Sequence, residues 1–157
     1  MKMLVLDDDG NVVNLLTRMC EREGHDVRGF TSPDRALKSL SDEAYDLLIT
    51  DLAMPDVDGI AVTRRAQKLQ KALFTLIITG HAGSFPLEEV LGDGTVDVMF
   101  KPFHLTELRA RIALAERRRA MIGRLQAQRF EIQSASAEMI QGLESELVEL
   151  RTGKPAR

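Results

Sequence analysis

A chain of 157 residues has room for one domain and an appendage. Its apolar fraction of 44% is ordinary for a globular protein, and only 4% aromatic residues with no Trp predict an aliphatic core. The net charge of -3 argues against a general nucleic-acid binder. The single Cys20 excludes an internal disulfide, and we interpret it as a small apolar residue of the first helix. No apolar run reaches the length of a signal peptide or a membrane span, so we expect a soluble, cytoplasmic protein.

Apolar runs and helical spacings alternate along residues 3–105. Short apolar runs between turn residues predict strands, and apolar residues three or four apart predict helices. The predicted strands cover 3–6, 26–30, 46–50, 73–78 and 95–100. The predicted helices cover 12–20, 33–40, 58–70 and 86–91, and a last helix starts near 105. Five such alternations favour an α/β fold, a doubly wound parallel sheet with right-handed crossovers.

Residues typical of helix starts mark several of these boundaries. Ser32 is placed to cap the second helix, with Pro33 in its first turn. Asp56 and Asp58 read as turn residues, and Asp58 also as the cap of the third helix. Asp9 reads as a cap-region or rim charge. The third helix should bury the apolar side chains of residues 60, 61, 62, 66 and 69.

Polar residues with useful chemistry follow four of the five strands. Asp7 and Asp8 follow the first strand, Asp51 the third, Thr79 the fourth and Lys101 the fifth. The carboxyl ends of parallel strands share one rim, so we expect these side chains to converge there. Taken singly, each has a simpler interpretation: Asp7 and Asp8 could cap the first helix, and Lys101 could be a solvated surface residue.

The converging groups predict a site for phosphoryl transfer to a carboxylate. Carboxylates a few ångströms apart repel each other, and a shared cation relieves this repulsion. Hard oxygen ligands with room for water suit Mg²⁺, and Lys101 offers a point charge suited to a phosphoryl oxygen. Asp51 would be the nucleophile, with the metal and Lys101 spreading the charge of the transferring group.

Four motifs in this order resemble the response-regulator receiver domain of two-component signalling. They are Val-Leu-Asp-Asp-Asp (5–9), Ile-Thr-Asp-Leu-Ala-Met-Pro-Asp-Val-Asp-Gly (49–59), Ile-Ile-Thr-Gly-His-Ala (77–82) and Val-Asp-Val-Met-Phe-Lys-Pro-Phe (96–103). Each would be weak evidence alone, but here each follows its own predicted strand. The resemblance runs from about residue 2 to 115 and implies a flavodoxin-like fold with five β-α units.

The resemblance also implies roles for the acidic residues. Asp51 would be the phosphorylated residue, receiving its phosphoryl group from a histidine of a partner sensor kinase. Asp8 would bind Mg²⁺ directly and Asp7 mostly through water, and the carbonyl of Ala53 would be a backbone ligand. Catalysis would be limited to the protein's own phosphorylation and slow autodephosphorylation.

The same resemblance implies roles for the residues after the last two strands. Lys101 would pair with the phosphoryl group, and its bond to Pro102 should be cis. Thr79 would move its hydroxyl onto a phosphoryl oxygen and draw the following loop inward. His81 could assist or hinder hydrolysis of the phosphoryl group, or be a solvent-exposed loop residue.

One position departs from the family pattern. Receiver domains usually carry Tyr or Phe where this chain has Val98, three residues before Lys101. That ring moves inward together with the Thr, and a valine has no ring to move. Two routes for the switch stay open: backbone shifts in the loop after Thr79, or movement of Phe100 or Phe103.

The last helix is predicted to continue far beyond the receiver-like region, because no Pro occurs between residues 103 and 155. A heptad-like seam with alternating spacings of three and four residues runs along it. It comprises Ile122, Leu125, Arg129, Ile132, Ser136, Met139, Leu143, Glu146 and Leu150. Six of these nine residues are apolar, and pairing with a second copy would bury them. We therefore expect a receiver domain at 1–115, a dimerising coiled-coil extension at 116–152 and a flexible end at 153–157.

The leading hypothesis is a phosphorylation-controlled switch that acts through this helix on an unidentified effector protein. A phosphorelay carrier that passes phosphate to another histidine protein is one alternative. A receiver fragment of a longer protein, with its effector domain missing, is another. A phosphate-independent scaffold would not need the complete set of acids, Thr and Lys. A phosphatase of another α/β family would need a second acid where Ala53 stands.

Overall fold

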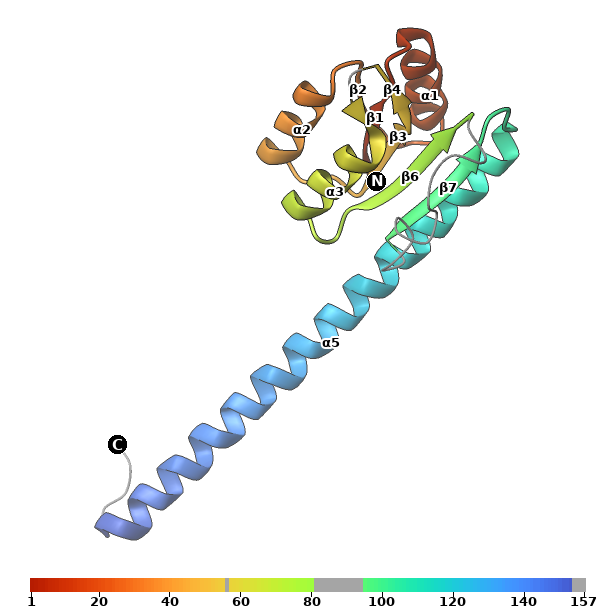
Figure 1. The fold of residues 1–157 in the computed structure, drawn as a ribbon. Helices are drawn as coiled ribbons and strands as arrows, with labels where there is room; N and C mark the ends of the chain where they lie inside the picture. The colour runs from red at the N-terminus through yellow and green to blue at the C-terminus, as the bar shows by residue number, and fades with distance from the viewer. Residues whose placement is uncertain (56, 81–94, 154–157) are drawn as a thin grey trace. The chain divides into compact units, whose positions relative to one another are not determined.

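The structure of the chain is a computed structural model that describes residues 1–55, 57–80 and 95–153 (Figure 1). The chain divides into two compact units, Met1–Glu116 and Arg117–Arg157. The predicted helix at 86–91, the turn residue Asp56 and the loop residue His81 lie outside the described residues.

The first unit is built on a five-stranded sheet in the order β2-β1-β3-β6-β7, in which every neighbouring pair is parallel. Its strands are β1 (Lys2–Leu6), β2 (Asp26–Phe30), β3 (Leu47–Asp51), β6 (Phe74–Thr79) and β7 (Val96–Phe100). The chain first adds β2 on one side of β1 and then builds outward on the other side. This reversal is the flavodoxin-like order, so the predicted fold class is confirmed.

Capping side chains set where the helices begin. The described helices are α1 (Gly10–Arg22), α2 (Pro33–Asp42), α3 (Gly59–Leu69) and α5 (Leu105–Thr152). Asp9, Ser32 and Asp58 each accept a hydrogen bond from a backbone N–H in the first turn of α1, α2 and α3. The capping predictions for Ser32 and Asp58, and the position of Pro33 in the first turn of α2, are confirmed.

Both faces of the sheet are covered. Leu4 and Leu6 of β1 lie in one cluster with Leu40 of α2 and Val62 of α3, and these two helices pack side by side (Figure 1). Met3 and Val5 point to the opposite face by strand alternation and are fully buried as well. Cys20 of α1 is buried and reduced, as expected of a small apolar residue.

The predicted buried face of α3 is partly wrong. Val62 and Ala66 are buried, but Ala61 is exposed and Leu69 is 49% exposed. The inward face is formed by Gly59, Val62, Thr63 and Ala66, at the spacing i, i+3, i+4, i+7. Ala61 lies about 200° around the helix from Thr63, so it faces outward. Leu69 is the last residue of the helix.

The strand ends also differ from the prediction in a way that matters for the site. Asp51 and Thr79 are the last residues of β3 and β6, whereas the predicted strands end one residue earlier. Asp51 pairs with Ile78 and Thr79 with Phe100 in the parallel ladders. The backbone of both residues is therefore fixed by the sheet.

A short antiparallel hairpin, which the sequence did not predict, follows β3. Its strands are β4 (Ala53–Met54) and β5 (Val57–Asp58). The hairpin brings the start of α3 back onto the end of β3, where Gly59 donates a hydrogen bond from its N–H to the carbonyl of Leu52 at 2.8 Å. A Cβ on Gly59 would lie 2.2 Å from the carbonyl oxygen of Asp51, so only glycine fits here.

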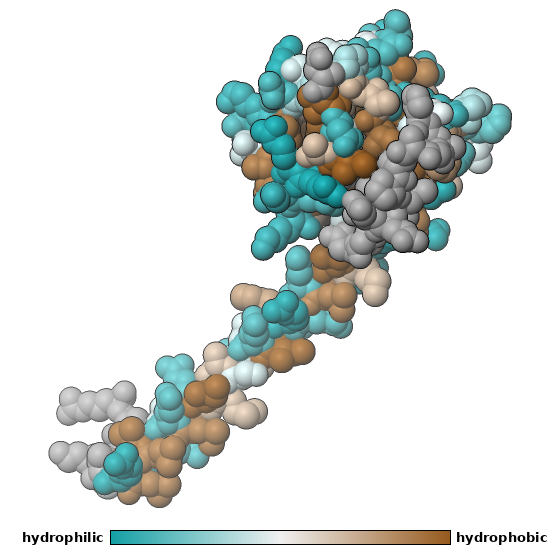
Figure 2. Space-filling view, viewed as in Figure 1, coloured by the Kyte–Doolittle hydropathy of each residue, from teal (hydrophilic) through white to brown (hydrophobic). Residues whose placement is uncertain are grey.

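Helix α5 runs without interruption over 48 residues. Within the first unit it buries Leu108, Ile112 and Ala115. Within the second unit the large apolar side chains of the helix are exposed, except for the partly buried Ile122, and Figure 2 shows several of the exposed ones along the helix. They are Met121, Leu125, Phe130, Ile132, Met139, Ile140, Leu143, Leu147, Val148 and Leu150. None of the described helices combines the length and apolarity that a membrane span requires.

The close approach at Gly59 predicts that Gly59→Ala destabilises the first unit. The added methyl group must displace the backbone of the loop after β3, at a cost of about 1–3 kcal/mol. Urea denaturation followed by circular dichroism would measure this. Gly10→Ala is the matched control, because a Cβ there meets only the Thr31 methyl group at 3.9 Å. Equal stabilities of the two variants would contradict the argument.

Candidate functional site

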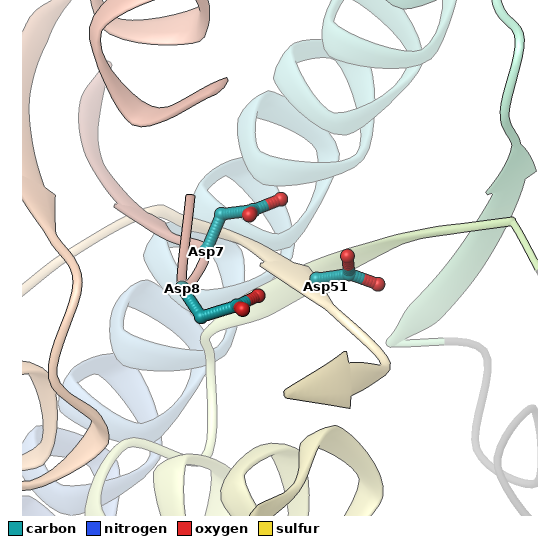
Figure 3. A group of neighbouring side chains, drawn as sticks. All are labelled: Asp7, Asp8 and Asp51. Atoms are coloured by element: carbon teal, nitrogen blue, oxygen red, sulfur yellow. The ribbon is translucent and has the colours of Figure 1, made fainter. Parts of the chain in front are cut away.

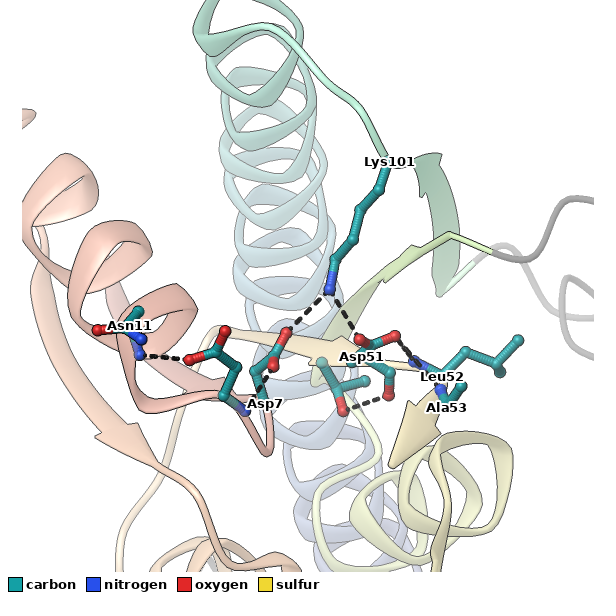
Figure 4. Close-up of polar contacts among 8 residues, drawn as sticks. Asp7, Asn11, Asp51, Leu52, Ala53 and Lys101 are labelled. Atoms are coloured by element: carbon teal, nitrogen blue, oxygen red, sulfur yellow. Dashed lines mark hydrogen bonds and ion pairs between the residues drawn. The ribbon is translucent and has the colours of Figure 1, made fainter. Parts of the chain in front are cut away.

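Asp51 is fixed by the backbone that follows it. Its Oδ1 accepts hydrogen bonds from the N–H groups of Leu52 at 2.6 Å and Ala53 at 3.3 Å (Figure 4). Its carbonyl oxygen accepts a hydrogen bond from the Thr50 hydroxyl at 3.0 Å. The Asp51 side chain is 12% exposed, so a small group from solvent can reach it.

Asp7 and Asp8 follow β1 and differ in their exposure. Asp7 is buried, and its Oδ1 accepts a hydrogen bond from the N–H of Asp9 at 2.9 Å. Its own N–H donates to the carbonyl of Phe30 at 3.3 Å, across the end of β2. Asp8 is exposed. The loop before α1 therefore presents one buried and one solvent-accessible carboxylate.

The three acids converge, as the sequence predicted. Asp7, Asp8 and Asp51 each place a carboxylate oxygen within 4.8 Å of the others (Figure 3). Such a group of hard oxygen atoms, graded from buried to exposed, fits a divalent cation that keeps some of its water, as Mg²⁺ does. Without a cation, the mutual repulsion of the carboxylates must be relieved in another way.

Lys101 relieves part of that repulsion. Its Nζ lies 2.7 Å from Oδ2 of Asp51 and 3.1 Å from Oδ2 of Asp7 (Figure 4). Burial disfavours the ammonium group, but the hydrogen bonds to Asp51 and Asp7 and their charges outweigh it and raise the pKa of Lys101. Lys101 is thus held in its charged form between the two carboxylates.

The backbone of Thr79 is hydrogen-bonded to that of Lys101. The N–H of Lys101 donates to the Thr79 carbonyl at 2.7 Å, and the peptide bond between Lys101 and Pro102 is cis, as expected. The Thr79 side chain is fully buried at the end of β6. A displacement of Thr79 would therefore displace the backbone at the end of β7.

Val98, where an aromatic residue was expected from the family pattern, lies in the core. It is 8% exposed and packs in a cluster with Leu52, Ile77 and Val96. Leu52 is the residue next to Asp51, so this cluster connects β7 to the loop that holds the acceptor carboxylate. Phe100 is 39% exposed and Phe103 is half-buried.

Sequence reasoning missed one contact at the site and one ion pair elsewhere in the first unit. One is the contact of Lys101 with Asp7, since Lys101 was expected only opposite the acids as a phosphoryl ligand. The other is an ion pair in which Nη1 of Arg111 donates to both carboxylate oxygens of Asp97, at 2.6 and 2.8 Å. A charged residue between Val96 and Val98 was the available signal for the second, because a strand core seldom keeps an unpaired acid.

Comparison with known proteins identifies the family. The family model described as "Response regulator receiver domain" matches residues 3–113. The response regulator receiver protein CpdR of Brucella abortus is 33% identical over 107 residues, which cover 68% of this chain and 89% of CpdR. The alkaline phosphatase synthesis transcriptional regulatory protein PhoP of Bacillus subtilis is 38% identical over 120 residues, 74% of this chain but only 49% of PhoP.

Solved receiver-domain structures have a similar fold. The receiver-domain protein (CheY-like) of Methanospirillum hungatei superposes with a TM-score of 0.70 at 22% identity, covering 76% of this chain and 96% of that one. The response regulator TrrA of Thermotoga maritima, solved in complex with Mg²⁺-BeF, has a TM-score of 0.63 at 26% identity and covers 73% and 97% of the two chains. The chain therefore belongs to the response-regulator receiver family of two-component signalling.

Proposed function

We propose that this protein is a phospho-acceptor switch in which Asp51 receives a phosphoryl group from a histidine of a partner sensor kinase. The observation that supports this most directly is the position of the Lys101 ammonium between Asp51 and Asp7, whose carboxylates converge with that of the exposed Asp8. This arrangement provides an acceptor oxygen, a cation for the transferring group and acids for a metal ion.

The proposed reaction is a displacement at phosphorus. A carboxylate oxygen of Asp51 forms a bond to phosphorus while the bond from phosphorus to the histidine nitrogen of the donor breaks. The donor imidazole leaves with the electron pair and takes up a proton. Lys101 would leave Asp7 and follow the charge onto a phosphoryl oxygen. The protein would act on no other substrate, apart from slow hydrolysis of its own acyl phosphate.

Four residues would hold Mg²⁺: Asp8 and Asp51 through their carboxylates, Asp7 mostly through water, and Ala53 through its carbonyl. The ion would stabilise the charge of the transferring phosphoryl group. Support comes from the convergence of the three carboxylates and from TrrA, a relative of similar fold solved in complex with Mg²⁺-BeF. We leave Asp58 out of this set, since its Oδ1 accepts a capping hydrogen bond from the N–H of Ile60.

The response to phosphorylation would start at Thr79 and travel through β7. The Thr79 hydroxyl would bond a phosphoryl oxygen, and the hydrogen bond from Lys101 N–H to the Thr79 carbonyl would carry the shift into β7. Val98 packs beside Leu52 and cannot swing as a ring does. We therefore infer that the conformational change is transmitted from Thr79 through the backbone of β7 and through Phe100, the exposed aromatic residue of that strand.

The output would use the extension of α5 at 116–152 as a dimerising helix. Its seam leaves Leu125, Ile132 and Leu143 between 50% and 66% exposed, and an isolated helix of this kind is only marginally stable in water. Pairing with a second copy would bury the seam. Phosphorylation would then bias how two receiver units are arranged on a shared coiled coil and which effector protein they bind.

Mg²⁺ titration by calorimetry tests the metal site. Asp8→Asn removes a carboxylate that the proposal assigns as a direct ligand, so the affinity for Mg²⁺ should fall by about tenfold or more. Asp58→Asn is the matched control: it lies in the same region, keeps its capping ability and should bind Mg²⁺ like the wild type. Equal affinities of all three proteins would contradict the assignment of Asp8.

Labelling with acetyl phosphate tests the acceptor. Incubated with Mg²⁺, the wild type and Asp58→Asn should gain the mass of one phosphoryl group, measured on the intact protein by mass spectrometry. Asp51→Asn, which keeps the size of the side chain but not the nucleophile, and Asp51→Ala should gain none. Labelling of the Asp51 variants to the wild-type extent would rule out the proposed function.

Light scattering tests the dimer. Leu125→Asp combined with Ile132→Asp places two charges in the seam, so the molar mass should fall from that of a dimer to that of a monomer. Ala127→Asp combined with Ser134→Asp is the matched control, with the same substituting residue and spacing on the opposite side of the helix. An unchanged mass for the seam variant would mean that another surface holds the oligomer.

A further inference from the structure

The seam of α5 contains two charged residues, Arg129 and Glu146. Both lie on exposed helix surface, and within the part of the chain that the structure describes neither takes part in an ion pair. A charge buried in a coiled-coil seam is costly unless it is paired. The position of these two residues therefore constrains how a second copy can bind.

We propose that two copies of α5 pair in antiparallel orientation, so that Arg129 of each copy lies against Glu146 of the other. This inference rests on the proposed homodimer and adds its orientation. The two-fold axis would pass between Ala137 and Glu138, and the Arg–Glu contact would occur twice, once on each side of that axis.

The same alignment matches the other layers of the seam. In an antiparallel pair, each a position of one helix lies against a d position of the other, and the two contacts alternate along the seam. With Arg129 opposite Glu146, the remaining layers are Leu125 with Leu150, Ile132 with Leu143 and Ser136 with Met139. One choice of register thus pairs both charged residues and leaves no charge against an apolar residue.

A parallel pair would bring like charges together. It would place Arg129 beside Arg129 of the second copy and Glu146 beside Glu146 of the second copy, and such like-charge contacts cost several kcal/mol. A phase shift after Ser136 could bring Ile140 and Leu147 into the seam and remove Glu146 from it. Arg129 would still face Arg129, so neither parallel arrangement neutralises it.

The residues beside the seam are compatible with the antiparallel pair. On one edge Gln126 would lie near Leu147 and Gln133 near Ile140; on the other, Gln128 would lie near Glu149 and Ala135 near Gly142. No two like charges meet on either edge, and the small Ala135 and Gly142 allow close approach of the backbones. The other charged residues of the paired segment occupy outer positions: Arg124, Glu131, Glu138, Glu144 and Arg151.

An open hollow on the helix surface lies along the seam. It is lined by Ile122, Leu125, Gln126, Gln128, Arg129 and Ile132. These residues form two successive sets with the spacing i, i+3, i+4, i+7, which is the hole that accepts one knob in knobs-into-holes packing. In the proposed register, the residues of the second copy that face this hollow include Glu146 and Leu150.

Charge reversal distinguishes the orientations. In the antiparallel dimer, Arg129→Glu sets a new carboxylate against Glu146 at both contacts, so the dissociation constant measured by sedimentation equilibrium should rise by about tenfold or more. Adding Glu146→Arg should restore it to within roughly threefold of the wild type. In a parallel dimer, Arg129→Glu only exchanges one like pair for another. Arg124→Glu, on the outer face, is the control and should leave the dissociation constant unchanged.

Disulfide formation gives an independent readout. Leu125→Cys and Leu150→Cys, mixed and oxidised with glutathione, should form a disulfide-linked heterodimer, because positions 125 and 150 are opposed only in the antiparallel pair. The wild type controls for Cys20, which should not react because burial raises its pKa to about 11. Cross-linking of Leu125→Cys alone to itself would overturn the proposal.

The possible failures are distinguishable. A wild-type protein that is monomeric at all concentrations would remove the homodimer together with its orientation, and would leave phosphorylation of Asp51 untouched. A dimer whose dissociation constant ignores Arg129→Glu would remove the antiparallel orientation alone.

Discussion

The site depends on one electrostatic constraint: three carboxylates from two distant parts of the sequence converge, and a positive charge must accompany them. Lys101 supplies that charge by bridging Asp7 and Asp51, at 3.1 and 2.7 Å. Parallel strands make the convergence possible, because β1, β3 and β7 all end at the same rim. The N–H of Lys101 is bonded to the carbonyl of Thr79, so the group that balances the acids is also fixed to β6.

Local patterns predicted much of this arrangement. The caps Ser32 and Asp58 can be recognised from their neighbours, and the acids at the strand ends follow from where each apolar run stops. The hairpin of β4 and β5 was missed because each of its strands has only two residues, too few to show an alternating pattern. The second contact of Lys101 was missed for a different reason: proximity to Asp7 depends on where β7 lies in the sheet.

In the sequence of the long helix, the heptad spacing of two buried residues of the first unit continues into the predicted seam. Leu108 and Ala115 are buried in the first unit and are seven residues apart, and Ile122, seven residues further, begins the seam. The absence of Pro between residues 103 and 155 predicted the continuous helix, which α5 confirms. Spacing alone left the orientation of a dimer open, because it treats Arg129 and Glu146 as separate interruptions. The proposed antiparallel dimer follows from considering the two residues together, because Arg129 of one copy can then pair with Glu146 of the other.

The central claim is that Lys101 exchanges Asp7 for the phosphoryl group when Asp51 is modified. The most direct measurement is a crystal structure of the protein with Mg²⁺ and beryllofluoride, a mimic of the phosphoryl group. We expect the mimic on Asp51, with Lys101 Nζ in contact with it and no longer bonded to Asp7. A structure in which Lys101 still bridges Asp7 and Asp51 while the mimic binds elsewhere would contradict this claim.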